Sequence, residues 1–408
     1  MKVLAINCGS STLKFQLVEV EGKDTAPGQQ RRLAFGIVDR IGEHTAIQFT
    51  SEKGEGLQQT SKVADYSDAA RRVLFWLRSL GLLRYDRLDA VGHRIVHGGG
   101  RFVEPTLIDA KTMDAIEDLS HLAPLHNEPS LEAIRAFREL LGPDVPQVAT
   151  FDTAFHRTLP TRASSYAIPL ELAEKHGIRR YGFHGLAHRY MTERYAAITG
   201  TPIDKIKLIT VQLGNGCSAT AVDGGRAVDT SMGFTPLEGL MMGTRSGDVD
   251  PSLAGFLARN EGVDIEEAED WLNTRSGLLG VSGSSQDMRE LLEAEREGNI
   301  RATLAVEMFC YRVRKCIGAY LTALGGASAL IFGGGIGENS PEVRARICED
   351  MGWCGLILDE ESNAEAIGVE RRISAEHSRI HAYVIPVDEG MIIVCDTVRC
   401  LRDQQQGD

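Results

Sequence analysis

The chain begins MKVLAINCGSSTLKFQLVEV (residues 1–20), and this stretch decides how the fold is interpreted. The apolar run at 3–6 predicts a buried strand, and the small polar residues at 7–12 predict a turn. Residues 13–20 largely alternate apolar and polar side chains, which predicts a second strand. The segment therefore predicts a β-hairpin at the N-terminus.

A similar hairpin is predicted near the middle of the chain. Residues 208–213 are mostly apolar and β-branched, 214–218 form a turn of small residues, and 219–222 resume the strand. Asp-Gly-Gly at 223–225 then predicts another hairpin turn. The two hairpins suggest an internal duplication with one copy in each domain. Because the match is short, two unrelated hairpins are the alternative.

Helical and strand patterns alternate through the rest of the chain. Helices are expected at 68–80, 129–141, 250–259, 288–297, 304–324 and from 391 onward, and strands at 88–96, 145–151 and 329–332. This alternation argues for α/β domains. The length of 408 residues suggests two or three of them.

Composition narrows the class of protein. Lys and Arg number 44 against 57 Asp and Glu, and a net charge of −13 argues against a general nucleic-acid binder. The eight cysteines contain no Cys-x-x-Cys pair, which disfavours zinc knuckles and fits a reducing compartment. No apolar run reaches 18 residues, so no membrane span is expected and a cytoplasmic protein is the default.

Two glycine-containing loops are candidate phosphate sites. In Asn7–Lys14 (NCGSSTLK), backbone N–H and hydroxyl groups can point at one anion beside Lys14, although an ordinary hairpin turn is the plainer interpretation. In Phe332–Pro341 (FGGGIGENSP), a strand runs into glycines, and Ser340 caps a helix with Pro341 at its first position. A tight strand–helix turn without a ligand is the alternative there. Neither loop matches a Rossmann or Walker motif.

Three basic residues lie in or beside further glycine turns. Arg94 precedes a glycine loop, and His184 and Arg245 each lie inside one. Arginines in such loops suit bidentate binding of carboxylate or phosphate. Each alone could be a surface or structural residue, but together with two candidate phosphate loops they indicate a functional site.

Two carboxylates are candidates for the same site. Asp152 ends a predicted strand, where α/β enzymes often place polar ligands. Glu389 precedes an apolar-periodic helix, so a helix-dipole carboxylate is the alternative for it. The pairs His93/His97 and His184/His188 have i, i+4 spacing, but their flanks do not support zinc.

The motifs taken together resemble the acetate kinase family. They run in order over nearly the whole chain: NCGSS (7–11), GHRIVHGG (92–99), FDTAFH (151–156), YGFHG (181–185), LGNG (213–216), GTRSGD (243–248) and GIGEN (335–339). The resemblance implies the duplicated two-domain α/β ATPase fold of actin, hexokinase and Hsp70, with an interdomain cleft. It implies an N-terminal domain of residues 1–152 joined by the C-terminal helix 388–408, and a nucleotide-binding domain of residues 153–387.

The resemblance also implies an activity. It is the reversible, direct in-line transfer of phosphate from ATP to acetate, giving acetyl phosphate and ADP, with Mg²⁺ or alternatively Mn²⁺. The implied partners are acetate, ATP and a second copy of the chain, in a cytoplasmic homodimer without nucleic acid or membrane.

The resemblance assigns roles residue by residue. The catalytic residues are Arg94, Asp152, His184 and Arg245, and the metal residues are Asn7 and Glu389. The apolar acyl pocket, with Arg94 as substrate ligand, is Val96, Leu125, Phe183 and Pro236. The nucleotide residues are Gln212, Leu213, Gly214, Asn215, Gly216, Asp287, Met288, Arg289, Gly334, Gly335, Ile336, Gly337 and Glu338. Lys14 is added to them from the loop argument above, as a cation that could meet a phosphate.

This chain departs from the family pattern at three positions. The family usually has His at Gln212, Thr at Gly333 and Glu at Gly390, which leaves the nucleotide preference open. The alternatives are a propionate kinase of the same family, a sugar kinase on the same fold and a non-enzymatic ATPase-fold protein.

A carboxylate substrate is already a nucleophile at pH 7, so positioning and charge neutralisation should carry the catalysis. Asp152 is therefore expected to orient Mg²⁺ or an arginine rather than to remove a proton. Asn7 and Glu389 are expected on opposite sides of one interdomain cleft.

Overall fold

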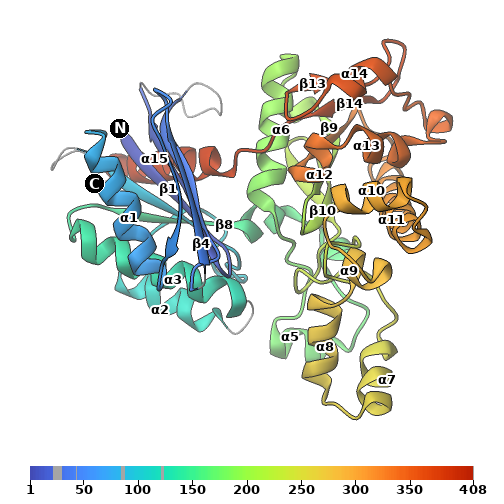
Figure 1. Cartoon of the computed structure of the whole chain (residues 1–408), viewed down its shortest axis with the longest axis horizontal. Helices are drawn as coiled ribbons and strands as arrows, with labels where there is room; N and C mark the ends of the chain where they lie inside the picture. Colours follow the sequence, from blue (N-terminus) through green and yellow to red (C-terminus); the bar gives the residue numbers. More distant parts are fainter. Residues whose placement is uncertain (22–29, 43, 84–87, 121–123, 408) are drawn as a thin grey trace. The chain divides into compact units, whose positions relative to one another are not determined.

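The structure is a computed structural model that describes residues 1–21, 30–42, 44–83, 88–120 and 124–407. The chain divides into two compact units (Figure 1). The first unit contains Met1–Phe155 and Asp388–Asp408, and the second contains His156–Val387. Within the described ranges, no helix combines the length and apolarity that crossing a membrane requires.

The first unit is built on a sheet in the order β5-β4-β3-β2-β1-β6-β8-β7. Its strands are β1 (Lys2–Cys8), β2 (Thr12–Glu19), β3 (Arg31–Asp39), β4 (His44–Ser51), β5 (Gly56–Lys62), β6 (Ala90–Ile95), β7 (Thr106–Leu107) and β8 (Gln147–Phe151). Strands β1 to β5 pair antiparallel, which confirms the N-terminal hairpin. Strands β6 and β8 continue parallel to β1, so three parallel carboxyl ends lie next to one another.

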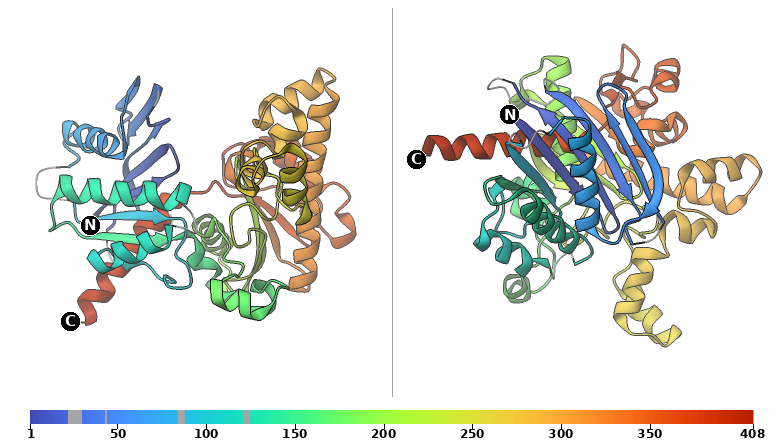
Figure 2. Two further views of the ribbon diagram at one scale, coloured as in Figure 1. Left: turned by 90° about the horizontal axis from the view of Figure 1, so that it is seen from below. Right: turned by 60° about the vertical axis from the view of Figure 1, so that its left-hand side comes forward.

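Helices cover both faces of this sheet. They are α1 (Tyr66–Ser79), α2 (Ala110–Asp118), α3 (Pro124–Leu141) and the C-terminal α15 (Glu389–Gly407), red in Figure 2. The His93 ring packs against Phe137 of α3, with ring centroids 5.9 Å apart. A Cβ on the preceding Gly92 would lie 2.3 Å from Thr397 Oγ1 and 2.6 Å from Ile393 Cγ2 of α15. Because successive strand residues face opposite sides, α3 and α15 pack on opposite faces.

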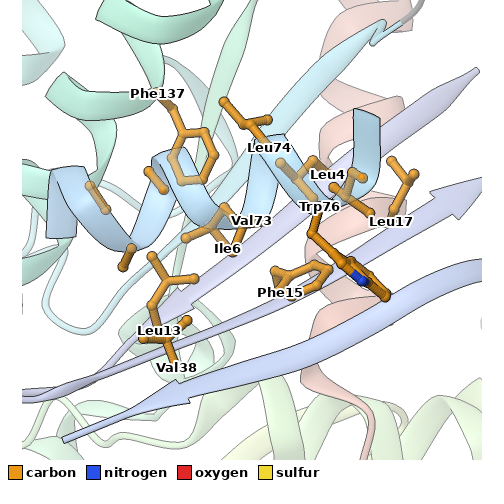
Figure 3. Packing of buried hydrophobic residues seen from close by; sticks show 14 of the residues in the cluster. Leu4, Ile6, Leu13, Phe15, Leu17, Val38, Val73, Leu74, Trp76 and Phe137 are labelled. Carbon is orange, nitrogen blue, oxygen red and sulfur yellow. The ribbon is translucent and has the colours of Figure 1, made fainter. Parts of the chain in front are cut away.

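The main core of the first unit lies between the sheet and α1 (Figure 3). Leu4, Ile6 and Leu17 from the strands meet Val73 and Leu74 of α1, and all five are fully or almost fully buried. The Phe15 ring contacts the rings of Phe49 and Trp76 edge to face, a favourable arrangement for buried rings. This packing holds β1 and β2, the two strands of the N-terminal hairpin, against α1.

The second unit repeats the strand order of the first around a smaller sheet. The order is β11-β10-β9-β12-β14-β13, from β9 (Lys207–Leu213), β10 (Cys217–Asp223), β11 (Arg226–Thr230), β12 (Ala329–Gly333), β13 (Arg371–Arg372) and β14 (His381–Val384). Here too an antiparallel hairpin is followed by two strands parallel to its first strand. The shared topology supports the duplication that the two hairpins suggested.

Helices surround the second sheet. They are α4 (Thr161–Ser164), α5 (Leu170–His176), α6 (Gly185–Thr199), α7 (Ser252–Glu261), α8 (Ile265–Thr274), α9 (Gly277–Ser282), α10 (Met288–Arg296), α11 (Ile300–Leu324), α12 (Gly334–Asn339), α13 (Pro341–Cys348) and α14 (Glu360–Glu365). Helix α6 packs on β9 and β12, and the 25-residue α11, orange in Figure 2, packs on β9 and β10. Short 3₁₀ segments lie at Asp152–Thr158, Ile203–Lys205 and Gly352–Cys354.

Two sequence expectations are wrong in detail. The helix expected from 129 begins at Pro124, so Pro129 lies inside it, although proline more often starts a helix. The glycine stretch expected as a loop after β12 forms the short helix α12. Glycine is required at the start of α12 for two reasons. The φ of Gly334 is +76°, a left-handed conformation that glycine adopts readily, and a Cβ at this position would lie 2.6 Å from Leu213 O.

Candidate active site

The first unit gathers three predicted site residues around the guanidinium of a fourth, Arg94. Arg94 donates from Nε and Nη2 to the two oxygens of Asp152, at 3.0 and 2.5 Å. Its Nη1 donates to Asn7 Oδ1 at 2.9 Å and lies 3.8 Å from Glu389 Oε2. Asn7 Nδ2 in turn donates to Glu389 Oε2 at 2.7 Å. The amide and both carboxylates thus form one cluster with Arg94.

The sheet topology explains this meeting. Asn7 lies in β1, Arg94 in β6 and Asp152 directly after β8, and these strands are parallel neighbours. Their carboxyl ends lie along one edge of the sheet, where open α/β sheets bind ligands. Glu389 arrives from the first turn of α15. The expectation that Asn7 and Glu389 lie across a cleft is wrong, because α15 belongs to the first unit and brings the two into direct contact.

The charges of this cluster favour a bound cation. Burial alone would lower the pKa of Arg94, but the carboxylates of Asp152 and Glu389 outweigh burial and raise it, so the guanidinium stays charged. One cation between two carboxylates leaves net negative charge. Carboxylate and amide oxygens are hard donors, and Mg²⁺ commonly uses one or two carboxylates with substrate phosphates. The donor set therefore fits Mg²⁺, with Asn7 and Glu389 as the side chains that would hold it.

A second cluster, in the second unit, carries positive charge. The β9–β10 turn passes through Gly216, and a Cβ there would lie 3.4 Å from His184 Nε2 and 3.6 Å from Arg245 Nη1. Both side chains therefore reach the same point of the turn. The loop that carries Arg245 is held there by a bond from Gly243 N to Asn215 O at 2.9 Å.

The backbone of His184 is unusual. His184 is the N-cap of α6 and has φ +57°, a left-handed conformation that residues other than glycine seldom adopt. Such conformations cluster at functional sites, where the surrounding structure holds them. The ring is held as well, because Nδ1 lies 2.8 Å from Ser218 Oγ. Backbone and ring together direct Nε2 toward Gly216.

Arg245 is a partly buried cation. Its Nη1 donates to Pro236 O at 3.4 Å and lies 3.8 Å from Met242 Sδ. In the described part of the chain, no carboxylate forms an ion pair or hydrogen bond with it, and burial lowers its pKa. A cation withdrawn from water without a carboxylate favours an anionic ligand.

A pocket of about 720 Å³ begins at the same turn of the second unit. Seven predicted nucleotide residues line it: Gly214, Asn215, Asp287, Met288, Arg289, Gly335 and Ile336. The other lining residues are Gln286, Leu292, Arg296, Asn339, Ser340, Pro341 and Glu342. Because Gly214 and Asn215 line the pocket while Gly216 adjoins His184 and Arg245, one turn joins a ligand-sized pocket to the pair of basic side chains.

Other predicted nucleotide residues do not line this pocket. Gln212 and Leu213 lie in β9, and Gly334 and Gly337 pack against Leu213 at the start of α12. Glu338 Oε1 accepts from Gly334 N at 2.8 Å and from Val387 N at 2.9 Å. Leu213, Gly334 and Gly337 are chain neighbours of the lining residues Gly214, Gly335 and Ile336.

Lys14 lies apart from the other predicted nucleotide residues, in the first unit. It is exposed on β2, directly across the hairpin from Asn7. Directly paired strand residues point to the same face of a sheet, so Lys14 adds positive charge beside Asn7.

Comparison with known proteins supports a kinase. The family model described as the acetokinase family matches residues 2–395. The acetate kinase of Solibacter usitatus is 48% identical over 98% of both chains. The chain belongs to the acetokinase family. It is therefore an enzyme, and its fold is the α/β ATPase fold expected from the sequence.

Two solved structures of this family have closely similar folds. The acetate kinase of Porphyromonas gingivalis superposes with a TM-score of 0.89, at 42% identity over 98% of this chain and 99% of that one. The propionate kinase of Francisella tularensis gives 0.88, at 38% identity over 97% and 98%. Because both kinds of kinase share the fold, the fold alone does not choose between acetate and propionate.

The expected acyl-pocket residues lie in both units. Val96 is buried but lies one residue beyond β6, so strand alternation from Arg94 does not set its direction. Phe183 is buried beside His184, and Pro236 is half-buried and accepts from Arg245. Leu125 lies in the first turn of α3, and its side chain falls outside the described residues.

The departures from the acetokinase pattern lie where a side chain would be crowded. Gly333 pairs with Gln212 across β12 and β9, and a Cβ on Gly333 would lie 2.7 Å from Met191 Sδ and Val387 Cγ2 and 3.1 Å from Gln212 Oε1. A Cβ on Gly390 would lie 2.7 Å from Gln16 Cδ. Gln16 Nε2 donates to Asp388 Oδ1 at 2.7 Å. At both positions the neighbouring side chains leave little room for a Cβ, and a glutamine is among these neighbours each time.

Sequence reasoning missed several site residues. Leu292 and Arg296 follow Met288 at i+4 and i+8 on α10, so helical spacing could have added them to the pocket. Ser218 and Thr210, which contact the His184 and His188 rings, have no sequence signal beyond being polar on strands. Of the first histidine pair, His93 Nε2 lies 2.7 Å from Gln147 Oε1, and His97 Nδ1 accepts from Gly99 N at 2.9 Å.

Proposed function

We propose that this enzyme catalyses the reversible transfer of the γ-phosphoryl group of ATP to acetate, giving acetyl phosphate and ADP. The observation that carries the proposal is the single β9–β10 turn that joins the pocket to His184 and Arg245. ATP bound in this pocket would direct its phosphates along the turn toward two positive or hydrogen-bond-donating side chains. Preorganised groups of this kind stabilise the charge of a phosphoryl transition state.

The chemistry requires no general base. Acetate is ionised at neutral pH, so the obstacle is the approach of one anion to another. Asp152 is unsuited to remove a proton, because it is fully buried and forms two hydrogen bonds with Arg94. Its proposed role is to hold the guanidinium of Arg94, which would bind the acetate carboxylate. Mg²⁺, held by Asn7 and Glu389, would supply positive charge to the phosphates.

The direct test is a hydroxamate assay for acyl phosphate with Mg-ATP and acetate, propionate or butyrate. We expect acyl phosphate from acetate, with a higher kcat/KM than from propionate. A higher value for propionate would reassign the substrate within the family. Purified folded protein that phosphorylates glucose but forms no hydroxamate would contradict the proposal.

The metal assignment predicts an effect of Glu389→Gln. Glutamine keeps an oxygen to accept from Asn7 but removes a negative charge from the cluster. The Mg²⁺ concentration for half-maximal activity should rise by about tenfold or more, and kcat should fall. The matched control is Glu360→Gln, a carboxylate in the first turn of α14. If the wild type and Glu389→Gln gave the same dependence of activity on Mg²⁺ concentration, Glu389 would be only a charge at the helix end and not a metal ligand.

The acyl pocket predicts an effect of Val96→Ala. Removing two carbons from a buried wall leaves room for one or two methylenes, and a methylene is typically worth about 1–3 kcal/mol in discrimination. The propionate-to-acetate ratio of kcat/KM should therefore rise by roughly tenfold, with Mg-ATP kinetics unchanged. The control Val91→Ala truncates another buried valine, in β6, and should lower stability alone. An unchanged ratio in Val96→Ala would remove Val96 from the pocket.

The proposed assembly is a cytoplasmic homodimer. Exposed apolar side chains in the second unit, including Leu170, Phe256 and Ile265, offer surface for a second copy. Light scattering should give twice the chain mass of 44.5 kDa. A monomer mass at assay concentration would contradict this assignment.

A further inference from the structure

A continuous chain of polar side chains runs from the interior of the second unit to His184. Thr210 Oγ1 lies 2.7 Å from His188 Nδ1, and His188 Nε2 lies 2.8 Å from Ser218 Oγ. The same Ser218 oxygen lies 2.8 Å from His184 Nδ1. Thr210, Ser218 and His188 are completely buried. The two contacts of His188 are therefore sheltered from competing water, and the contact between Ser218 and His184 is partly buried.

The serine hydroxyl makes the two histidines depend on each other. Ser218 has one proton, so it can donate to only one imidazole and must accept from the other. If it donates to His184 Nδ1, then His188 Nε2 carries a proton. If the chain runs the other way, His184 Nδ1 carries the proton instead. The direction of the chain thus sets the tautomer of His184.

The surroundings of His184 favour a neutral ring. His184 is at the N-terminus of the 15-residue helix α6, where the helix dipole is positive. Its Nε2 edge and the Arg245 guanidinium adjoin the same glycine, so a second cation there is disfavoured. His188 is neutral as well, because burial, reinforced by His156 and His184, lowers its pKa well below the usual value.

A neutral His184 can donate from Nε2 only when Nδ1 accepts. This requires Ser218 to donate to His184, His188 Nε2 to donate to Ser218, and Thr210 to donate to His188 Nδ1. Thr210 has another acceptor, Thr220 O, but at 3.4 Å it is more distant than His188 at 2.7 Å. Each contact in this direction has one donor and one acceptor.

We propose that Thr210, His188 and Ser218 are positioning residues that hold His184 as a neutral imidazole with its proton on Nε2. In this state Nε2 donates a hydrogen bond to the phosphoryl group during transfer, while Arg245 supplies the charge. The inference rests on the proposed phosphoryl transfer for its kinetic consequence. The tautomer itself is a property of the protein without substrate.

The first test is ¹⁵N NMR of the histidine rings in the full-length protein, with assignment by His184→Gln and His188→Gln. We expect Nε2 of both His184 and His188 to be protonated and both Nδ1 atoms to be unprotonated. A protonated Nδ1 on either ring would overturn the proposal. Because this readout needs no substrate, it stands whether or not the kinase activity is found.

The second test is kinetic. Ser218→Ala should lower kcat about tenfold with little change in KM for ATP, since one buried hydrogen bond that orients the ring is lost. Thr210→Val removes a hydroxyl at nearly constant volume and should lower kcat about threefold or more, whereas Thr210→Ser keeps the hydroxyl and should stay near wild type.

The control for both variants is Thr192→Val. The Thr192 hydroxyl is also buried on α6, but it donates to the His188 backbone oxygen rather than to the ring. Equal kcat values for Ser218→Ala, Thr210→Val and Thr192→Val would overturn the proposal. If the wild type forms no acyl phosphate, the proposed function fails while the NMR result still decides the tautomer.

Discussion

Replacing Arg245 with alanine should lower kcat/KM for acetate by on the order of 100-fold or more. Arg245 has no carboxylate partner among the described residues, so its charge is available to a ligand. Losing one preorganised group that stabilises transition-state charge typically costs about 3–4 kcal/mol. Stability should change little, because no ion pair is broken.

Two further variants sharpen the Arg245 experiment. Arg245→Lys keeps the charge without the planar fork and should recover only part of the activity. The control Arg226→Ala removes an exposed arginine of β11 in the same unit and should leave kcat/KM unchanged. Near-wild-type activity in folded Arg245→Ala would remove this residue from the mechanism.

Arg94→Ala should lower kcat/KM by a similar factor or more, and it should also destabilise the protein. Asp152 is completely buried, and removing Arg94 leaves its carboxylate without its guanidinium partner. Breaking one partner from a buried ion pair costs about 3–5 kcal/mol. The midpoint temperature of thermal unfolding should therefore fall together with kcat/KM in Arg94→Ala, whereas in Arg245→Ala only kcat/KM should fall.

Activity and stability at Arg94 can be separated. Arg94→Lys keeps a positive charge beside Asp152 and should recover much of the stability, but the two-point contact with Asp152 is lost. We therefore expect Arg94→Lys to be folded and still impaired by at least about tenfold in kcat/KM. A folded Arg94→Lys or Arg94→Ala with wild-type kinetics would exclude Arg94 from substrate binding.

The sequence alone predicted the elements that depend on local patterns. Both hairpins follow from short runs of apolar residues around small-residue turns, and the structure places β1–β2 and β9–β10 there. Ser340 was expected to cap a helix with Pro341 at its first position, and α13 begins in this way. Capping and strand alternation act over a few residues, so they can be inferred from a short window.

The resemblance to the family named the candidate site residues, and the family comparisons confirmed the fold and the family. It did not show how those residues contact one another. The contact between Asn7 and Glu389 joins positions 382 residues apart, and the sequence expectation put them on opposite sides of a cleft. The resemblance already placed the C-terminal helix with the N-terminal domain, but the direct contact depends on how α15 packs against Gly92 of the first sheet.

The sequence by itself determined the α/β class and the two hairpins, and it named the basic and acidic residues that are candidates for the site. The tertiary structure decided the partners of those residues: Asp152 for Arg94, Ser218 for His184, and α10 with α13 as pocket walls. The physical reason is the distance along the chain over which each interaction acts. Local propensity is set by neighbours along the chain, whereas hydrogen-bond partners, burial and pocket shape are set by strands and helices that meet only when the chain folds.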